Sequence, residues 1–423
     1  MDINELLKGR KNCGCKKDHK CEIEHVRIGS GVINELPQLS RKYKNILIAA
    51  DNNTYRVCGS RAAKLLEDKT ECVKVFDGPG LLIPNEDAIA GLSACLTQKT
   101  DLIVGVGSGV INDLCKYVSY KNNLPYFIVA TAPSMDGFAS SGAAMITNNM
   151  KTTFSAHVPA AVIGDVDVLK EAPIEMIRSG FGDIIGKYSA LCDWKLSELV
   201  NGEYMCKYVY DLTYSTVERT KQLADGIEKR DAQAIKTLME ALVIVGIAMA
   251  YVGNSRPASG SEHHLSHYFE ITGIIKNRGY LLHGIDVAYS AVQTQKLRQK
   301  IIALGTMPDK TYVFDRAKWE EHIRKSYGFA ADGVIELQDK LGLYNAGLEK
   351  IYREKWDKII EILKQAPSAE NLCGVLDTVG INYADFEKFY GRDVIDDAVL
   401  YAKDLKDRYT VLWLYFTLFA DSK

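Results

Sequence analysis

The sequence predicts an α/β domain with a parallel sheet over residues 1–170, followed by an all-helical domain over residues 171–423. In the first part, short apolar runs alternate with stretches of helical periodicity, which is typical of βα units. After Pro173 the strand-like runs stop and helical periodicity continues to the end. A chain of 423 residues that is 47% hydrophobic can fill a core in each part.

The charge balance excludes several classes of function. The chain has 52 Lys and Arg against 54 Asp and Glu, so neither a nucleic-acid-binding surface nor a polybasic membrane surface is expected.

The first residues, MDINELLKGRKN, lack the apolar core of a signal peptide, and the apolar run 241–252 is shorter than a bilayer span, so we expect a buried helix there. Ten scattered cysteines then indicate reduced thiols and a cytoplasmic location.

The first elements follow one another at short intervals. IEHVRIGSGVINEL predicts a strand, a glycine turn and a short helix, and KNILIAADNNTY predicts a strand that ends at Asp51. Residues 56–67 have helical periodicity, and ECVKVFDGPG predicts the next strand and turn. Asn85 is a common type of N-cap and marks the start of another helix.

A glycine-rich turn follows the next strand. Residues 102–106 are a buried strand, and GVGSG leads directly into a helix that begins near Val110. Such a turn lets backbone N–H groups approach a diphosphate, which the start of a helix favours. Asp51, at another strand end, could bind ribose hydroxyls. Because the spacing differs from the usual GxGxxG, a tight turn without a ligand is the alternative.

A polar loop comes after the strand at residues 125–130. Ligands bind beside such strand-end loops in open α/β sheets, although a plain surface loop rich in Ser and Gly has the same composition. The polar residues of this loop are Thr131, Ser134, Asp136, Ser140 and Ser141. HVPAAVIGD predicts one more strand before Pro173. No linker rich in Pro or Gly separates the two parts, so we expect them to share a cleft.

Residues 253–286 contain four of the eight histidines. His263 and His267 are four residues apart, which places them on one face of a helix, and Glu262 falls in the first turn. His283 lies near a second helix start. A catalytic divalent metal needs imidazoles and a carboxylate on one side. The alternative is a polar helix face with one hydrogen-bonded core histidine.

Asp183 is the best candidate for that carboxylate. It lies in SGFGDIIGKYSALCDW, whose glycines would weaken a helix and therefore suggest the close approach of another backbone or a ligand. The alternative is that Asp183 only caps its helix and forms a surface pair with Lys187.

The amino-terminal segment holds a second group of possible metal ligands, namely Cys13, Cys15, His19, Cys21 and His25. Their spacing matches no standard zinc pattern. We therefore expect a mobile lead-in with ordinary thiols.

Five motifs together resemble the bacterial branch of the glycerol-1-phosphate dehydrogenase family: GSGVINDLCKY, TAPSMDGFASS, GFGD, GSEHHLSH and LLHG. This family belongs with 3-dehydroquinate synthases, glycerol dehydrogenases and iron-containing alcohol dehydrogenases. The resemblance extends from about Glu22 to Phe419. It implies a Rossmann-like domain, a helical metal-binding domain, an active site in the cleft between them, and a homodimer.

The resemblance also implies the reaction and the residues that perform it. The family interconverts dihydroxyacetone phosphate and sn-glycerol 1-phosphate with NAD or NADP and one divalent metal, which would be zinc, nickel or iron. Its metal ligands match Asp183, His263 and His283. Its cofactor contacts match Asp51, Gly109, Val110, Ile111, Asn112, Asp113, Thr131, Ala132, Pro133, Ser134 and Ser140. Asp136 and His267 match substrate-contacting, catalytic positions beside Asp183, with His267 relaying a proton and Asp136 gripping a hydroxyl.

Related activities remain as alternatives. Iron-type alcohol dehydrogenases commonly have a fourth ligand, a His, where this chain has Lys187. Glycerol dehydrogenase, acting on unphosphorylated glycerol, is closer because it also uses Asp, His and His. A nucleotide-binding sensor without chemistry is the non-enzymatic alternative. Arg256 and Lys151 are candidates for binding a phosphate, and a surface salt bridge would explain either residue as well.

Overall fold

The computed structural model describes residues 2–78, 80, 82–147, 150–309 and 313–420. The chain divides into two compact units. The first comprises Met1–Ile184 and Glu218–Ser255, and the second comprises Ile185–Val217 and Arg256–Lys423. The division cuts through two continuous helices, α8 (Ile174–Asn201) and α9 (Lys207–Lys221).

The first unit is built on a six-stranded sheet in which every pair of neighbouring strands is parallel. Its order is β1-β8-β5-β4-β2-β3. The strands are β1 (His25–Gly29), β2 (Ile46–Asp51), β3 (Thr70–Phe76), β4 (Leu102–Gly107), β5 (Tyr126–Ala130) and β8 (Ala161–Asp165). The four central strands are buried almost throughout, because helices cover both faces of a parallel sheet.

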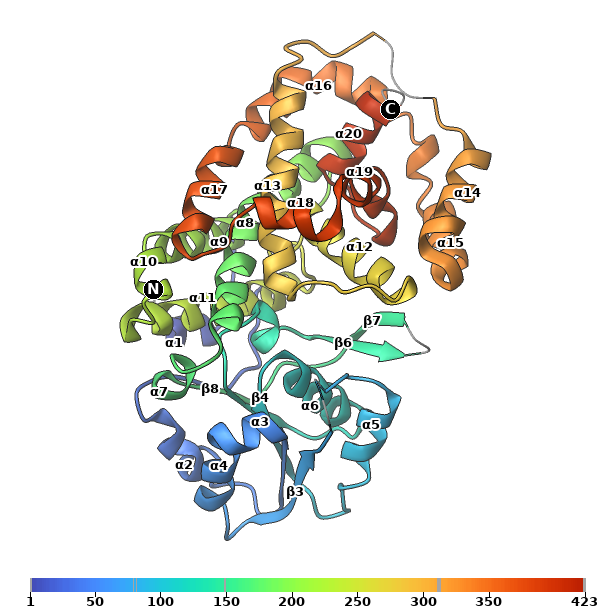
Figure 1. The fold of residues 1–423 in the computed structure, drawn as a ribbon. Coiled ribbons are helices and arrows are strands. Elements are labelled where there is room, and N and C mark those ends of the chain that lie inside the picture. Colours follow the sequence, from blue (N-terminus) through green and yellow to red (C-terminus); the bar gives the residue numbers. More distant parts are fainter. Residues whose placement is uncertain (1, 79, 81, 148–149, 310–312, 421–423) are drawn as a thin grey trace. The chain divides into compact units, whose positions relative to one another are not determined.

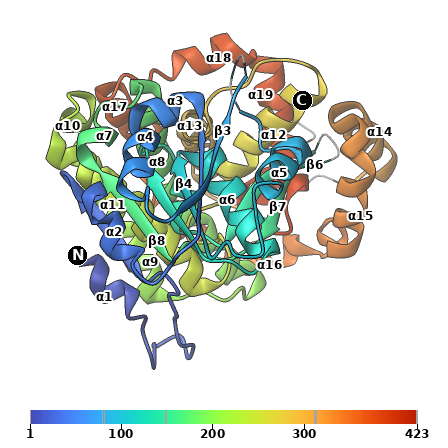
Figure 2. The same cartoon turned by 90° about the horizontal axis from the view of Figure 1, so that it is seen from below.

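Helices α2 (Leu36–Leu39) and α4 (Ser60–Leu65) lie on one face of the sheet, and α5 (Glu86–Ser93) and α6 (Gly109–Lys121) lie on the other (Figures 1 and 2). The alternate residues of β2, such as Ile46 and Ile48, pack with the first pair of helices into one core. Helix α4 follows β2 and α6 follows β4, so the helices change face between these neighbouring strands. The carboxyl ends of β2 and β4 therefore form the switch point at which open α/β sheets bind ligands.

Two features of the first unit differ from the sequence analysis. A hairpin of β6 (Gly142–Thr147) and β7 (Met150–Ser155) follows the predicted polar loop, where no element was predicted. The apolar run near residue 250 belongs to a longer helix, α11 (Ala232–Val252). Its length and composition would allow it to cross a membrane, and 78% of its apolar stretch is buried, as in the core helix of a globular protein.

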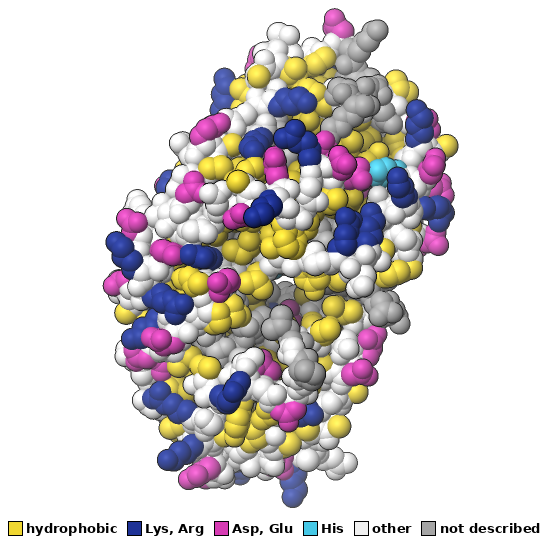
Figure 3. All heavy atoms as spheres, viewed as in Figure 1, with side chains coloured by type: hydrophobic (Ala, Val, Ile, Leu, Met, Phe, Trp, Pro, Cys, Tyr) yellow, Lys and Arg dark blue, Asp and Glu magenta, His cyan; other side chains and the backbone are white. Residues whose placement is uncertain are grey.

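The described residues of the second unit form helices and connecting loops, with no strand among them. Its main helices are α12 (Ser261–Ile275), α13 (His283–Ile302), α14 (Arg316–Tyr327), α15 (Ala331–Leu341), α16 (Leu348–Leu363), α17 (Ala369–Thr378), α18 (Ala384–Tyr390), α19 (Arg392–Tyr401) and α20 (Val411–Phe419). Helices α12 and α13 pack against each other, and α13 also contacts α16, α17 and α20. Charged side chains of both signs are interspersed on the face drawn in Figure 3, consistent with the formal charge of −2.

A buried ion pair fixes α8 against α12 and α13. Arg298 on α13 donates to Asp193 on α8 at 2.8 Å, and both side chains are fully buried. The other carboxylate oxygen of Asp193 accepts the Ser261 N–H, at the start of α12, at 2.7 Å. Breaking this ion pair would leave a buried charge without a partner, which would cost free energy. Helices α8, α12 and α13 therefore keep a fixed arrangement within the second unit.

The structure confirms the predicted fold class, since a parallel-sheet part precedes a large helical part. The change from strands to helices falls after β8, as expected. The domain boundary after residue 170 stays a prediction, because the two compact units group residues 218–255 with the sheet.

Candidate active site

Asp51 and the glycine turn lie side by side at the switch point of the sheet. Ala50 is paired with Val106, so the next residues, Asp51 and Gly107, are adjacent strand ends. The Asp51 carboxylate accepts the N–H groups of Asn53 and Thr54 at 2.8 and 2.9 Å. These bonds hold Asp51 at the carboxyl end of β2.

The glycines of the turn let α6 pack closely against β4. A Cβ atom on Gly107 would lie 2.6 Å from Ile111 Cβ, and one on Gly105 would lie 2.8 Å from Cys115 Sγ. Helix α6 starts at Gly109, and its N-cap residue, Ser108, makes no side-chain capping bond. The first N–H groups of α6 are thus available at the strand end, where a diphosphate would be favoured.

The side chains in the first turn of α6 pack and form hydrogen bonds within the protein. Ile111 and Asn112 are buried, and the Asn112 amide donates to the Gly137 carbonyl at 3.3 Å. The Asp113 carboxylate accepts the Ala144 N–H at 3.1 Å. If this turn contacts a cofactor, its backbone is therefore the part that makes the contact.

The loop after β5 lies against both the glycine turn and α8. The Thr131 N–H donates to the Gly107 carbonyl at 3.1 Å, and the Ser179 hydroxyl on α8 donates to the Ser134 carbonyl at 3.1 Å. A Cβ atom on Gly180 would lie 1.8 Å from the Pro133 carbonyl oxygen. The glycine at this position of α8 is thus needed for close approach, as the sequence analysis predicts.

Lys116 organises the next part of the loop, and the sequence analysis missed it. Its buried ammonium donates to the carbonyls of Gly137 and Gly142 at 2.8 and 2.9 Å and to the Ser140 hydroxyl at 3.3 Å. Burial lowers the pKa of Lys116, and the Asp113 carboxylate, 3.6 Å away, opposes that shift. A lysine in a helical pattern is usually predicted to lie on the surface. Only the fold therefore reveals that Lys116 supports the loop containing Ser140.

Asp183 connects this loop to helix α8. The Asp136 N–H donates to the Asp183 carboxylate at 2.9 Å, at the start of the short helix η3 (Asp136–Ala139). Helix α8 begins at Ile174, so Asp183 cannot cap it. Asp183 and Lys187 are both fully buried, so the surface-pair alternative is wrong.

Three histidine rings lie together on α12 and α13. The ring centroids of His263 and His283 are 5.1 Å apart, and the His267 ring is 6.2 and 5.8 Å from them. The Glu262 carboxylate lies 2.7 Å from Nδ1 of His263. Burial alone would raise the pKa of Glu262, but its bonds to His263 and to the Gly260 N–H lower it, so Glu262 is a carboxylate. This bond orients His263 so that Nε2 would be the metal-binding nitrogen.

The position of Asp183 on α8 places it close to His263 and His283. Gly186 is one turn further along α8, and a Cβ atom there would lie 2.4 Å from Val287 on α13 and 3.4 Å from the Glu262 side chain. Asp183 is on the same face of this helix. Candidate ligand atoms of Asp183, His263 and His283 lie within 4.8 Å of one another. A carboxylate with two imidazoles fits a catalytic divalent ion that keeps positions open for substrate.

Comparisons with known proteins show the family to which the chain belongs. The chain is 37% identical to the glycerol-1-phosphate dehydrogenase [NAD(P)+] of Halalkalibacterium halodurans over 71% of its own length and 79% of the relative's. For the enzyme of Bacillus licheniformis the identity is 30%, over 96% of this chain and 91% of that one. The chain belongs to the glycerol-1-phosphate dehydrogenase [NAD(P)+] family. This confirms the family that the motifs predict.

More distant matches agree on the fold. The iron-containing alcohol dehydrogenase family model matches residues 27–173. A glycerol dehydrogenase from Schizosaccharomyces pombe superposes with a TM-score of 0.53 at 18% identity, over 88% of this chain and 92% of that one. An archaeal alcohol dehydrogenase from a Red Sea brine pool superposes with a TM-score of 0.55 at 14% identity, over 95% and 98%. At these identities the likeness concerns the fold alone.

Arg256 and His264 are two buried residues near the site motifs, and the structure accounts for both without a ligand. Arg256 is buried and pairs with Glu203 at 2.8 Å, which explains it without a phosphate. The Lys151 side chain lies outside the described residues. His264 is fully buried, and burial and the nearby Arg408 hold its pKa well below the usual value. Neither ring nitrogen of His264 has a hydrogen-bond partner among the described residues, so it is a neutral core histidine.

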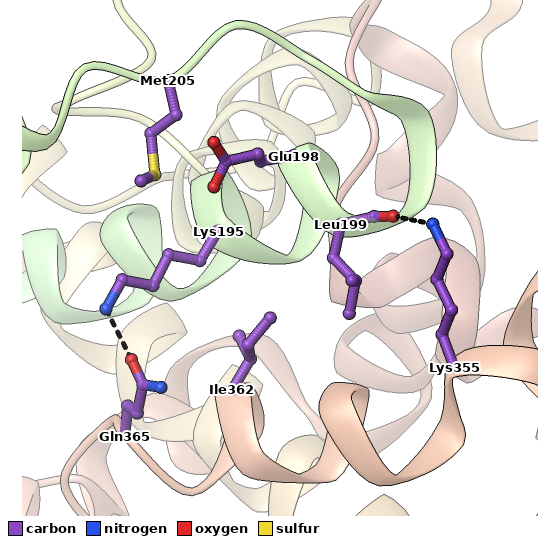
Figure 4. A pocket seen from close by; sticks show the side chains of 7 residues that line it. All are labelled: Lys195, Glu198, Leu199, Met205, Lys355, Ile362 and Gln365. Atoms are coloured by element: carbon purple, nitrogen blue, oxygen red, sulfur yellow. Dashed lines mark hydrogen bonds between the residues drawn. The ribbon is translucent and has the colours of Figure 1, made fainter. Parts of the chain in front are cut away.

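A pocket of about 480 Å³ in the second unit is not part of this site (Figure 4). Its two lysines are already bonded to protein atoms, since Lys195 donates to Gln365 at 2.6 Å and Lys355 donates to the Leu199 carbonyl at 2.7 Å. It is lined by Lys195, Glu198, Leu199, Met205, Lys355, Ile362 and Gln365. No histidine is in this lining, so it offers none of the chemistry assembled by Asp183, His263 and His283.

Proposed function

We propose that the protein interconverts dihydroxyacetone phosphate and sn-glycerol 1-phosphate, using NAD(H) or NADP(H), at a metal site formed by Asp183, His263 and His283. Membership of a family whose relatives carry this name supports the reaction. The observation that carries the proposal for the site is the convergence of one buried carboxylate with two imidazoles.

The switch point at the carboxyl ends of β2 and β4 supports the proposed cofactor site. The start of α6 would hold the diphosphate through backbone N–H groups, and the glycine turn leaves room for that approach. Asp51 would bind ribose hydroxyls, which suits NAD. The loop 131–134 and Ser140 would border the cofactor, with Lys116 keeping Ser140 in place.

The donor set fits a divalent ion such as zinc, nickel or iron. When bound, that ion would supply Lewis-acid chemistry, polarising the substrate oxygen while the nicotinamide exchanges hydride with the neighbouring carbon. Glu262 orients His263, and the Asp136 N–H orients the Asp183 carboxylate. The chain thus holds Asp183 and His263, two proposed ligands, by hydrogen bonds before any ion binds, and Nδ1 of His283 lies 3.5 Å from the Ser266 hydroxyl.

His267 is the proposed proton-transfer group. Its ring stands beside the rings of His263 and His283, one helical turn after His263. Imidazole can hold or release a proton near neutral pH, which suits the alcohol oxygen of the substrate. Asp136 would hydrogen-bond a substrate hydroxyl near Asp183.

Steady-state kinetics on matched substrates test the proposed function. With NADH and added metal, we expect the highest kcat/KM for dihydroxyacetone phosphate and a much lower value for dihydroxyacetone. With NAD+ and added metal, we expect oxidation of glycerol 1-phosphate in preference to glycerol 3-phosphate. Preference for the unphosphorylated compounds would instead indicate a glycerol dehydrogenase. NADH binding without consumption of any of these substrates would indicate a sensor.

A further inference from the structure

The amino-terminal segment contains a second cluster of metal-ligand side chains. Cys13, Cys15 and His19 lie close to Cys206, which immediately precedes α9. One ligand atom from each of these four residues lies within 4.8 Å of the others. Cys13, His19 and Cys206 are buried and Cys15 is partly buried, so the sequence-based expectation of a mobile lead-in is wrong, while the expectation of ordinary thiols stays a prediction.

The backbone folds this segment into a compact turn. Arg10 and His19 form an antiparallel bridge through two backbone hydrogen bonds of 2.8 Å. Between them, the Lys16 N–H donates to the Cys13 carbonyl at 2.8 Å, and Asn12 and Lys16 adopt left-handed backbone angles. Residues other than glycine rarely adopt such angles, so a defined turn holds Cys13 and Cys15 on either side of one glycine.

His19 is oriented as a metal-bound histidine would be. Its Nδ1 lies 2.8 Å from the Tyr251 carbonyl oxygen, and its ring stacks on the Tyr251 ring with centroids 5.3 Å apart. A backbone carbonyl can only accept a hydrogen bond, so Nδ1 carries the hydrogen and donates, and Nε2 is the nitrogen with a lone pair. Nε2 is 3.4 Å from the Cys15 sulfur. Tyr251 in turn donates its hydroxyl to the Leu6 carbonyl, which ties the segment to α11.

These separations suit one tetrahedral zinc ion. With zinc–sulfur lengths of about 2.3 Å and zinc–nitrogen lengths of about 2.0 Å, tetrahedral ligand atoms lie roughly 3.5 to 3.8 Å apart. The observed 3.4 Å between Cys15 Sγ and His19 Nε2 is close to this value. Three thiolates around one Zn²⁺ would leave a charge of −1. The five basic residues between positions 10 and 20, against one acidic residue, would balance it.

We propose that Cys13, Cys15, His19 and Cys206 form a second metal site, which takes zinc and is structural. Four protein ligands leave no coordination position for substrate, which is the property of structural zinc sites. The site shares no residue with the Asp183, His263 and His283 set, so its zinc would fix the amino-terminal segment and take no part in the reaction.

Metal content of the full-length protein tests this proposal. In protein purified with a reductant and zinc, we expect two equivalents per chain in the parent and in Cys21→Ser, a control with a cysteine outside the set. We expect about one equivalent in Asp183→Ala, in Cys13→Ser and in Cys206→Ser, and close to none when Asp183→Ala is combined with Cys206→Ser. Equal zinc in Cys206→Ser and Cys21→Ser would overturn the proposal.

A second measurement avoids dependence on the cysteine variants, which could fail to fold. In Asp183→Ala the remaining zinc should show X-ray absorption from three sulfur atoms at about 2.3 Å and one nitrogen. A shell of only nitrogen and oxygen, or a protein without zinc, would contradict the proposal. So would a disulfide among these cysteines, detected as thiols that alkylate only after reduction. None of these outcomes depends on turnover, so the proposed function can fail or hold independently.

Discussion

At the scale of single residues, Glu262 has two roles. The sequence predicts one of them, and only the structure shows the other. Its place in the first turn of α12 predicts a favourable interaction with the helix dipole. The structure adds its bond to His263 and its bond to the Gly260 N–H. Only the bond to His263 relates to the proposed metal site. A carboxylate bonded to one ring nitrogen of a histidine leaves the other ring nitrogen to face the ion.

His267 provides the residue-scale test of the chemistry. For His267→Ala we expect bound metal to be kept and kcat to fall by roughly 100-fold or more, the usual effect of losing a positioned acid or base. The pH dependence of kcat should also lose its imidazole limb. Metal analysis and a pH profile of kcat measure both effects. An unchanged kcat with the same pH profile would show that His267 only packs beside His263 and His283.

Sequence patterns could predict the residues that lie in recognisable motifs, and they missed those whose partners are distant in the chain. Asp183 and the histidines of residues 253–286 stood out as possible ligands, and the family resemblance then implied the set of Asp183, His263 and His283. Lys116 did not, because its acceptors are backbone carbonyls of the loop at residues 137–142. Cys206 did not because nothing in its local sequence connects it with Cys13.

At the scale of elements, α8 is the helix on which the site depends. One of its faces meets the loop after β5 through Gly180, and further along the helix Gly186 meets α13. The sequence analysis predicted close approaches here because glycine weakens a helix and must have another use. The hairpin β6–β7 was not predicted, because its first strand, GAAMIT, begins with Gly and Ala, which are depleted in strands.

A pair of glycine substitutions tests the packing of α8. In Gly180→Ala the new Cβ atom would meet the Pro133 carbonyl oxygen, which is backbone and cannot turn away. We expect a loss of about 1–3 kcal/mol in the free energy of unfolding and a raised KM for NADH, because the loop 131–134 would shift.

The matched control is Gly374→Ala, on the exposed face of α17. A Cβ atom there would meet nothing within 4 Å, so this change should stabilise the protein by about 0.5–1 kcal/mol and leave KM unchanged. Chemical denaturation and NADH kinetics measure both variants. Equal stability and equal KM in the two variants would contradict the packing described for Gly180.

At the scale of the whole molecule, the order of elements was predictable because strand and helix patterns have different periods. Alternation up to residue 165 and helical periodicity afterwards specify a parallel sheet followed by helices, as observed. The grouping of residues 218–255 with the sheet was not predictable. It arises from α11, whose Gly246 packs against Ala139, and no local pattern encodes that contact.

The central claim is that Asp183, His263 and His283 hold one metal ion that the reaction requires. Its most direct test is the rate of NADH oxidation with dihydroxyacetone phosphate as zinc, nickel or iron is added back to protein stripped of metal. We expect at least one of these metals to restore turnover in the parent chain, while Asp183→Ala stays inactive at every concentration yet keeps its helical circular dichroism. Full turnover in the stripped parent, or equal restoration in Asp183→Ala, would contradict the claim.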